Sequence, residues 1–124
     1  MLGKVFIVED ETALLYALQA KLKIEGFDTE VADSAEGVVE KIRSFMPDVV
    51  LLDLLLPKGD GWQILKDLKD DKDLKKIPVI IVSNLGDSEN KKKGKDMGAE
   101  DYIVKSNYDL KYIVNRIKKL LKIK

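Results

Sequence analysis

The chain has 124 residues, of which 45% are hydrophobic and 35% are charged, a balance typical of a globular domain rather than a disordered or fibrous chain. It contains neither cysteine nor histidine, which excludes disulfide scaffolds, thiolate and imidazole metal sites, and Ser-His-Asp triads. A metal site would need oxygen ligands, which favour Mg²⁺, Ca²⁺ or Mn²⁺. The apolar runs are too short to span a bilayer, and acidic residues 9–11 come too early for a signal peptide. We therefore expect one cytoplasmic domain over residues 1–124, without membrane contact.

The charges are unevenly distributed along the chain, although the formal net charge is zero. Acidic residues outnumber basic ones over residues 1–85, and basic residues outnumber acidic ones over residues 86–124. This asymmetry is compatible with a cation site followed by a partner-facing surface, and equally with lysine-rich solvated helices. The lysines lack an accompanying arginine cluster or aromatic platform, so direct nucleic-acid binding is not expected.

Strand and helix patterns alternate along the chain. Short apolar or alternating runs predict five strands, at residues 4–8, 28–32, 49–52, 79–82 and 102–104. Apolar residues at helical spacing predict a helix after each strand, at residues 11–25, 34–46, 61–70, 88–97 and 108–123. Ser34 is expected to open the second helix, and Pro47 to end it. Apolar strands joined by helical crossovers predict a doubly wound α/β sandwich with a parallel sheet.

Polar side chains follow four of the predicted strands. They are Glu9, Asp10 and Glu11 after the first, Asp53 after the third, Ser83 and Asn84 after the fourth, and Lys105 and Ser106 after the fifth. In a parallel sheet these positions meet at one edge, where ligands bind. Clustered carboxylates favour a hard divalent cation, and one carboxylate can act as a nucleophile that forms an acyl phosphate. A hydroxyl and an ammonium can hold the phosphoryl oxygens.

Each of these residues also has an ordinary explanation. Asp53 alone is compatible with a cap or turn, Glu9 and Asp10 with charges at a helix N-terminus, and Lys105 with a solvated side chain. Their coincidence at one predicted edge favours a site. The chain has neither G-x-x-x-x-G-K-[ST] nor G-x-G-x-x-G after its first strand, so nucleotide binding through either of these motifs is not supported. A haloacid dehalogenase-type phosphatase would need an acid where Leu55 stands.

Several motifs occur in a characteristic order over essentially the whole chain. They are the strand with its acidic pair over residues 5–11, the run over 47–53 that ends in Asp53, Leu56-Pro57, Asp60-Gly61-Trp62, the run over 77–83 that ends in Ser83, and the run over 98–105 that ends in Lys105. Together they resemble the receiver domains of bacterial two-component response regulators. The resemblance implies a flavodoxin-like (βα)5 sandwich with five parallel strands in the order 2-1-3-4-5.

The resemblance also implies a role for each site residue. Asp53 would accept a phosphoryl group from a phosphohistidine. Mg²⁺, or Mn²⁺ in its place, would be bound by Asp10, Asp53 and the backbone carbonyl of Leu55, with Glu9 acting directly or through water. Ser83 and Lys105 would bind the phosphoryl oxygens, and Asn84 would lie at the mouth of the site, where it positions or hinders the hydrolytic water. Ser83 and Tyr102 would form the switch that alters the partner-binding face.

The implied partners are a sensor histidine kinase or histidine phosphotransfer protein, and a downstream effector protein. The chain would be a monomer or weak dimer, and it would catalyse only its own phosphorylation and dephosphorylation rather than turn over a substrate. Two residues depart from the family pattern, since Ser106 replaces the usual proline and Asn84 a usually small residue. They leave open a pseudo-receiver that binds partners constitutively without phosphorylation. A small Mg²⁺-dependent phosphohydrolase on the same carboxylates is a further alternative.

Overall fold

The computed structural model describes residues 2–107 and 109–123. One parallel sheet runs through the molecule in the order β2-β1-β3-β4-β5. Its strands are β1 (Lys4–Val8), β2 (Asp28–Ala32), β3 (Val49–Leu52), β4 (Val79–Ser83) and β5 (Asp101–Val104). The predicted fold class and strand order are confirmed.

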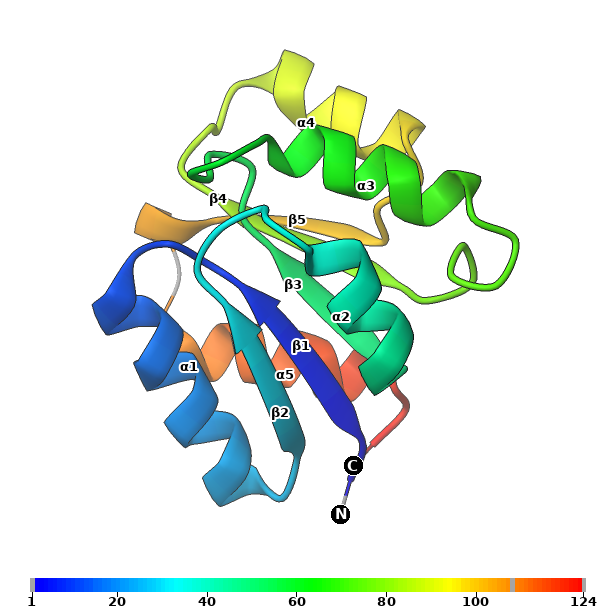
Figure 1. Ribbon diagram of the computed structural model, residues 1–124. Helices are drawn as coiled ribbons and strands as arrows, with labels where there is room; N and C mark the ends of the chain where they lie inside the picture. The colour runs from blue at the N-terminus through cyan, green and yellow to red at the C-terminus, as the bar shows by residue number, and fades with distance from the viewer. Residues whose placement is uncertain (1, 108, 124) are drawn as a thin grey trace.

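Five helices cover the two faces of the sheet (Figure 1). Helices α1 (Thr12–Glu25) and α5 (Leu110–Leu120) lie on one face, and α2 (Val38–Phe45), α3 (Gly61–Asp70) and α4 (Ser88–Asp96) lie on the other. A short 3₁₀ helix, η1 (Lys105–Asn107), follows β5. In the part of the chain that the structure describes, no helix is both long and apolar enough to cross a membrane.

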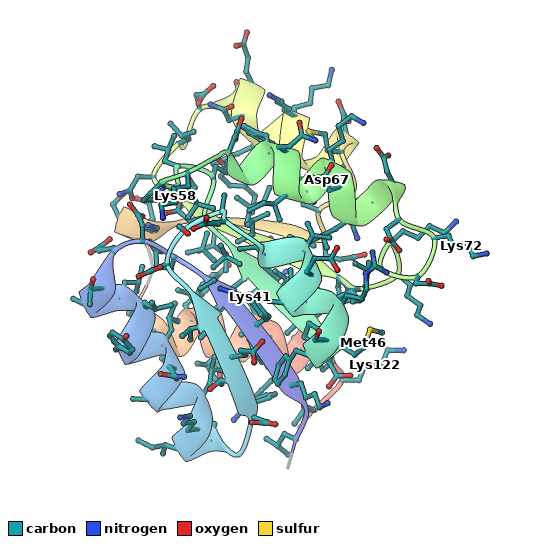
Figure 2. All side chains as sticks on the ribbon, in the orientation of Figure 1. Lys41, Met46, Lys58, Asp67, Lys72 and Lys122 are labelled. Carbon is teal, nitrogen blue, oxygen red and sulfur yellow. The ribbon has the colours of Figure 1, made fainter. Side chains whose placement is uncertain are left out.

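Alternate residues of the inner strands pack into two separate cores. On β1, Phe6 and Val8 face the core under α2 and α3, whereas Val5 and Ile7 face the core under α1 and α5. All four of these side chains are at most 1% exposed. Burial on both faces explains why the inner strands are continuous apolar runs rather than alternating ones. Polar side chains occupy the outer helix surfaces, such as Lys41 on α2 and Asp67 on α3 (Figure 2).

The second helix begins later than the sequence predicts, so the prediction that Ser34 opens it is wrong. The Ser34 hydroxyl accepts a hydrogen bond from the backbone N–H of Glu36 at 3.3 Å, and Gly37 adopts a left-handed conformation with φ 67°. These residues form a turn, and helical geometry starts only at Val38. The end falls close to the predicted stop, because Met46 leaves the helix just before Pro47, where helical geometry is disfavoured.

The last helix is shorter than predicted. It spans Leu110–Leu120 and is capped by Asp109, whose carboxylate accepts a hydrogen bond from the backbone N–H of Tyr112 at 2.9 Å. The predicted start at Tyr108 lies outside the described residues. Three side chains fix α5 to the sheet through burial, namely Ile113, Val114 and Ile117.

Candidate functional site

The carboxyl ends of β1 and β3 place three acids next to each other. These strands are adjacent and parallel, with Val8 paired to Leu52, so Glu9 and Asp53 follow directly at the same edge of the sheet. The backbone N–H of Asp53 donates to the carbonyl of Val8 at 2.9 Å, which extends the pairing by one step. The site is therefore built on the rigid ends of two central strands.

Glu9, Asp10 and Asp53 form a cluster of oxygen donors. One carboxylate oxygen from each residue lies within 4.8 Å of the others. Glu9 is 2% exposed and Asp53 is 4% exposed, whereas Asp10 faces solvent. Two buried carboxylates and an accessible third repel one another, and a divalent cation with hard oxygen ligands relieves that repulsion. The donor set fits Mg²⁺ or Mn²⁺. Leu55, the other predicted ligand, donates its backbone N–H to Asp53 Oδ1 at 3.4 Å.

Lys105 reaches across the edge of the sheet into this cluster. Its Nζ lies 3.0 Å from Asp53 Oδ2 and 2.8 Å from the Glu9 carboxylate. Lys105 is the first residue of η1, which follows β5 directly. Its side chain is only 12% exposed. Although burial lowers the pKa of Lys105, the hydrogen bonds and charges of the two acids raise it above its ordinary value, so the amine is a fixed cation.

Glu9 has the most perturbed carboxyl group of the site. Burial raises its pKa from 4.5 to about 7, and the negative charge of Asp53 acts in the same direction. The hydrogen bonds from Lys105 and from the backbone N–H of Glu11 lower the pKa but do not offset the burial. The protonation of Glu9 therefore changes near neutral pH, and a cation bound at the cluster would favour the ionised form.

Ser83 and Tyr102 both contact Leu85 in the β4–α4 loop, and their side chains also interact directly. Ser83 is fully buried, and its hydroxyl accepts a hydrogen bond from the backbone N–H of Leu85 at 3.2 Å. The Tyr102 hydroxyl donates to the backbone carbonyl of Leu85. The Ser83 hydroxyl, the Leu85 backbone and the Tyr102 hydroxyl therefore form one chain of contacts.

A hollow of about 540 Å³ opens beside the carboxylates. Its lining includes Asp10, Leu55, Leu56, Pro57 and Trp62. Leu55, two residues after Asp53, is 60% exposed, so part of this lining is an apolar surface open to solvent. Asn84, which directly follows the buried Ser83, is exposed at the end of β4. Both the hollow and the exposed Asp10 leave the cluster accessible from solvent.

The structure thus brings Glu9, Asp10, Asp53 and Lys105 into one cluster, as the strand-end pattern predicts. Two further residues to which the sequence assigns no role also contribute: Glu11, which stands among the strand-end acids, and Leu85. Glu11 Oε2 lies 3.8 Å from Lys105 Nζ, and its place in the acidic run after β1 was a usable signal. Leu85 contributes its backbone N–H to Ser83 and its carbonyl to Tyr102. The pattern of side chains in the sequence does not indicate such backbone contacts.

Comparison with known proteins agrees with this arrangement. The family model described as response regulator receiver domain matches residues 5–118. The phosphate regulon transcriptional regulatory protein PhoB of Escherichia coli K12 is 33% identical over 122 residues, which cover 98% of this chain and 53% of PhoB. The chain therefore spans about half the length of this curated relative.

Solved structures with a similar fold are also receiver domains of response regulators. The receiver domain of the Francisella response regulator 1452 superposes with a TM-score of 0.88 at 30% identity, covering 97% of both chains. The BeF3-activated N-terminal receiver domain of Klebsiella pneumoniae RstA has a TM-score of 0.86 at 29% identity, covering 95% of this chain and 97% of that one. With the fold, the strand-end cluster and the family match in agreement, the chain belongs to the receiver domains of two-component response regulators.

Proposed function

We propose that this receiver domain is a Mg²⁺-dependent phosphoacceptor switch, in which Asp53 takes a phosphoryl group from a phosphohistidine on a partner protein. The observation that carries the proposal is the cluster itself, in which Asp53 lies beside two further acids and a buried lysine. An acid that only caps a helix or forms a turn does not require two further acids and a buried lysine beside it. A metal ligand set and a phosphoryl-binding cation next to one carboxylate match the requirements of phosphoryl transfer.

The transfer is a nucleophilic displacement at phosphorus. A carboxylate oxygen of Asp53 forms the new P–O bond, the P–N bond to the donor imidazole breaks, and the imidazole leaves with the electron pair of that bond. Mg²⁺, when bound by Glu9, Asp10 and Asp53, would neutralise charge on the phosphoryl oxygens. Lys105, now paired with Asp53, would bind a phosphoryl oxygen of the product and stabilise the charge that develops there.

The phosphoryl group would act as a switch through Ser83. A hydrogen bond from the Ser83 hydroxyl to a phosphoryl oxygen would move that hydroxyl, and the Leu85 backbone would carry the displacement to Tyr102. Only a difference in free energy between the two conformations can shift their populations. The new hydrogen bond, present in one conformation alone, supplies such a difference.

The partners follow from this cycle. A sensor histidine kinase or a histidine phosphotransfer protein would donate the phosphoryl group, and an effector would bind the altered surface. Since relatives such as PhoB are about twice as long and are named as transcriptional regulators, the effector can also be a further domain of the same polypeptide. The receiver itself would not turn over a substrate, and would catalyse only its own phosphorylation and dephosphorylation.

Intact-mass measurement after incubation with acetyl phosphate and Mg²⁺ tests the proposal. We expect one added phosphoryl group on the wild type, and none on Asp53→Asn or on wild type treated with a chelator. A folded wild type that binds Mg²⁺ but accepts no phosphoryl group, from acetyl phosphate or from a phosphorylated kinase, would contradict it.

That last outcome would instead support the pseudo-receiver, a constitutive protein-binding module. Two observations give this alternative its weight: Ser106 stands where the family usually has proline, and Asn84 is exposed beside Ser83. Reverting the two positions, with Asn84→Ala and Ser106→Pro, would then restore phosphorylation. Repeated hydrolysis of a small phosphoester, abolished in Asp53→Asn, would indicate the phosphohydrolase alternative.

A further inference from the structure

Helix α4 is held to the rest of the molecule by few apolar contacts. Its sequence, from Ser88 to Asp96, contains no large apolar residue, and its one buried residue is Gly94. By comparison, α3 buries Ile64, Leu65 and Leu68. Because burial of apolar surface is the main force that fixes a helix to a sheet, α4 is an element of low local stability.

The lysines of α4 add little attraction within the domain. Lys91, Lys92, Lys93 and Lys95 are all exposed, and none forms an ion pair within residues 2–107 and 109–123. Like charges three or four residues apart on a helix repel each other. One of the four nevertheless has a partner, because Lys93 Nζ lies 4.3 Å from the centre of the Trp62 ring on α3. This distance is that of a cation–π contact.

Trp62 is firmly tied to the strand that carries the phosphoacceptor. The preceding Gly61 donates its backbone N–H to the carbonyl of Leu54 at 3.0 Å. A Cβ at Gly61 would lie 2.3 Å from the backbone oxygen of Asp53, so α3 begins in direct contact with the backbone of Asp53. The backbone N–H of Trp62 also donates to Asp60 Oδ1 at 2.8 Å. The start of α3, and with it the Trp62 backbone, is thus fixed relative to Asp53.

Gly94, the residue after Lys93 on α4, lies against the tyrosine of the switch. A Cβ at Gly94 would lie 3.1 Å from the Tyr102 ring, so the helix backbone packs closely on that ring. The Tyr102 hydroxyl is bonded to Leu85, in the loop that leads directly into α4. Helix α4 therefore contacts two aromatic residues, Trp62 at the start of α3 and Tyr102, which shares contacts with Leu85 and Ser83.

We propose that Lys93 and Trp62 form a latch, which is closed in the unphosphorylated protein and opens when phosphorylation displaces α4. This inference rests on the proposed function. A shift of Ser83 moves Leu85 and the start of α4, while α3 stays with Asp53, so the two helices move relative to each other. The latch joins these two helices and stabilises only the unphosphorylated arrangement. It therefore weakens the response to phosphorylation by the free energy of the contact.

The protein contains a single tryptophan, Trp62, so its emission reports on the surroundings of that ring, which include both Lys93 and the hollow beside Asp10. The experiment is a titration with beryllium fluoride, a phosphoryl mimic, in the presence of Mg²⁺. Lys93→Met keeps the aliphatic chain but removes the charge, and we expect it to bind beryllium fluoride roughly two- to fivefold more tightly than wild type. Its emission before addition should also differ from that of wild type, and the change on addition should be smaller.

Two variants separate the latch from a change in net charge or stability. Lys92→Met makes the same charge change on the adjacent residue and should bind beryllium fluoride like wild type. Lys93→Arg retains a cation over the ring and should restore wild-type affinity. The affinity for Mg²⁺ alone should be equal in all four proteins, because none of the substitutions touches the carboxylates.

The possible outcomes distinguish this inference from the proposed function. If wild type accepts a phosphoryl group from acetyl phosphate but Lys93→Met binds beryllium fluoride no more tightly, the latch is overturned and the function stands. If Lys92→Met tightens binding as much as Lys93→Met, net charge is the cause and the latch is again overturned. If wild type takes neither phosphoryl group nor beryllium fluoride, the proposed function fails and the latch with it.

Discussion

Lys105 Nζ lies 3.0 Å from Asp53 Oδ2, although Asp53 follows β3 and Lys105 follows β5, with β4 between them in the sheet. The same ammonium lies 2.8 Å from the Glu9 carboxylate. In the absence of a metal ion, Lys105 therefore supplies the positive charge that the clustered acids need. Lys105 therefore competes with any metal cation that binds to Asp53.

We predict that Lys105→Met tightens Mg²⁺ binding, because the substitution removes a positive charge from beside two of the ligands. The expected effect is roughly three- to tenfold, as about 1 kcal/mol of charge repulsion would give. Titration calorimetry measures it. Lys72→Met, at an exposed lysine far out on the α3–β4 loop (Figure 2), should bind Mg²⁺ like wild type. Weaker binding by Lys105→Met would mean that the lysine organises the carboxylates rather than competes with the metal.

The raised pKa of Glu9 predicts a pH dependence of stability in the absence of divalent cations. The folded protein keeps a proton on Glu9 up to about pH 7, whereas the unfolded chain releases it near pH 4.5. Between these values the folded state binds more protons, so the free energy of unfolding falls as the pH rises, by on the order of 1–3 kcal/mol in total. Urea unfolding from pH 5 to 8 with a chelator present measures this slope.

Glu9→Gln should flatten that pH dependence, because the amide cannot titrate. Glu30→Gln, at an exposed position on the edge strand β2, is the matched control and should keep the wild-type slope. Added Mg²⁺ should raise stability most at the upper end of the range, where Glu9 is ionised and able to bind. An unchanged slope in Glu9→Gln would show that another group dominates the titration.

Gly61→Ala should destabilise the protein by about 1–3 kcal/mol, the usual cost of forcing an extra methyl group into a packed site. The added Cβ would lie 2.3 Å from the Asp53 backbone oxygen and 2.5 Å from Leu54 Cα, and backbone atoms cannot rotate away. Gly86→Ala is the comparison, because the nearest atom to its Cβ would be in the Val104 side chain at 3.3 Å, and the nearest backbone atom, the Asn84 oxygen, would lie at 4.0 Å. Urea unfolding of both variants should therefore separate them, and equal stabilities would contradict the close approach.

Much of the fold and site was predictable because two simple patterns coincide in this sequence. Apolar runs define the inner strands, and polar residues directly follow them. Parallel pairing then brings Glu9, Asp53 and Lys105 to one edge, whatever the details of the loops. The receiver family and its strand order were predicted from motifs at the same positions, and both are confirmed.

The remaining features depend on contacts that a linear pattern does not contain. The start of α2 is set by the left-handed conformation of Gly37, which competes with the capping preference of Ser34. One link between Ser83 and Tyr102 passes through the backbone of Leu85, so the identity of residue 85 gives no signal. The contact of Lys93 with Trp62 requires the relative placement of two helices, which packing against the sheet decides.

Tyr102→Phe should lower the free energy of unfolding by about 0.5–1.5 kcal/mol, because it removes the hydrogen bond from the hydroxyl to the Leu85 carbonyl. Burial also raises the pKa of Tyr102 above its ordinary value of 10.0, so the variant should lose an absorbance component that titrates above pH 10. Tyr16→Phe, at a side chain that is 56% exposed, should leave stability unchanged. If both variants unfold at the wild-type urea concentration, the Tyr102 hydroxyl exchanges its bond with water, and the Leu85 link to Ser83 cannot transmit a displacement to the ring.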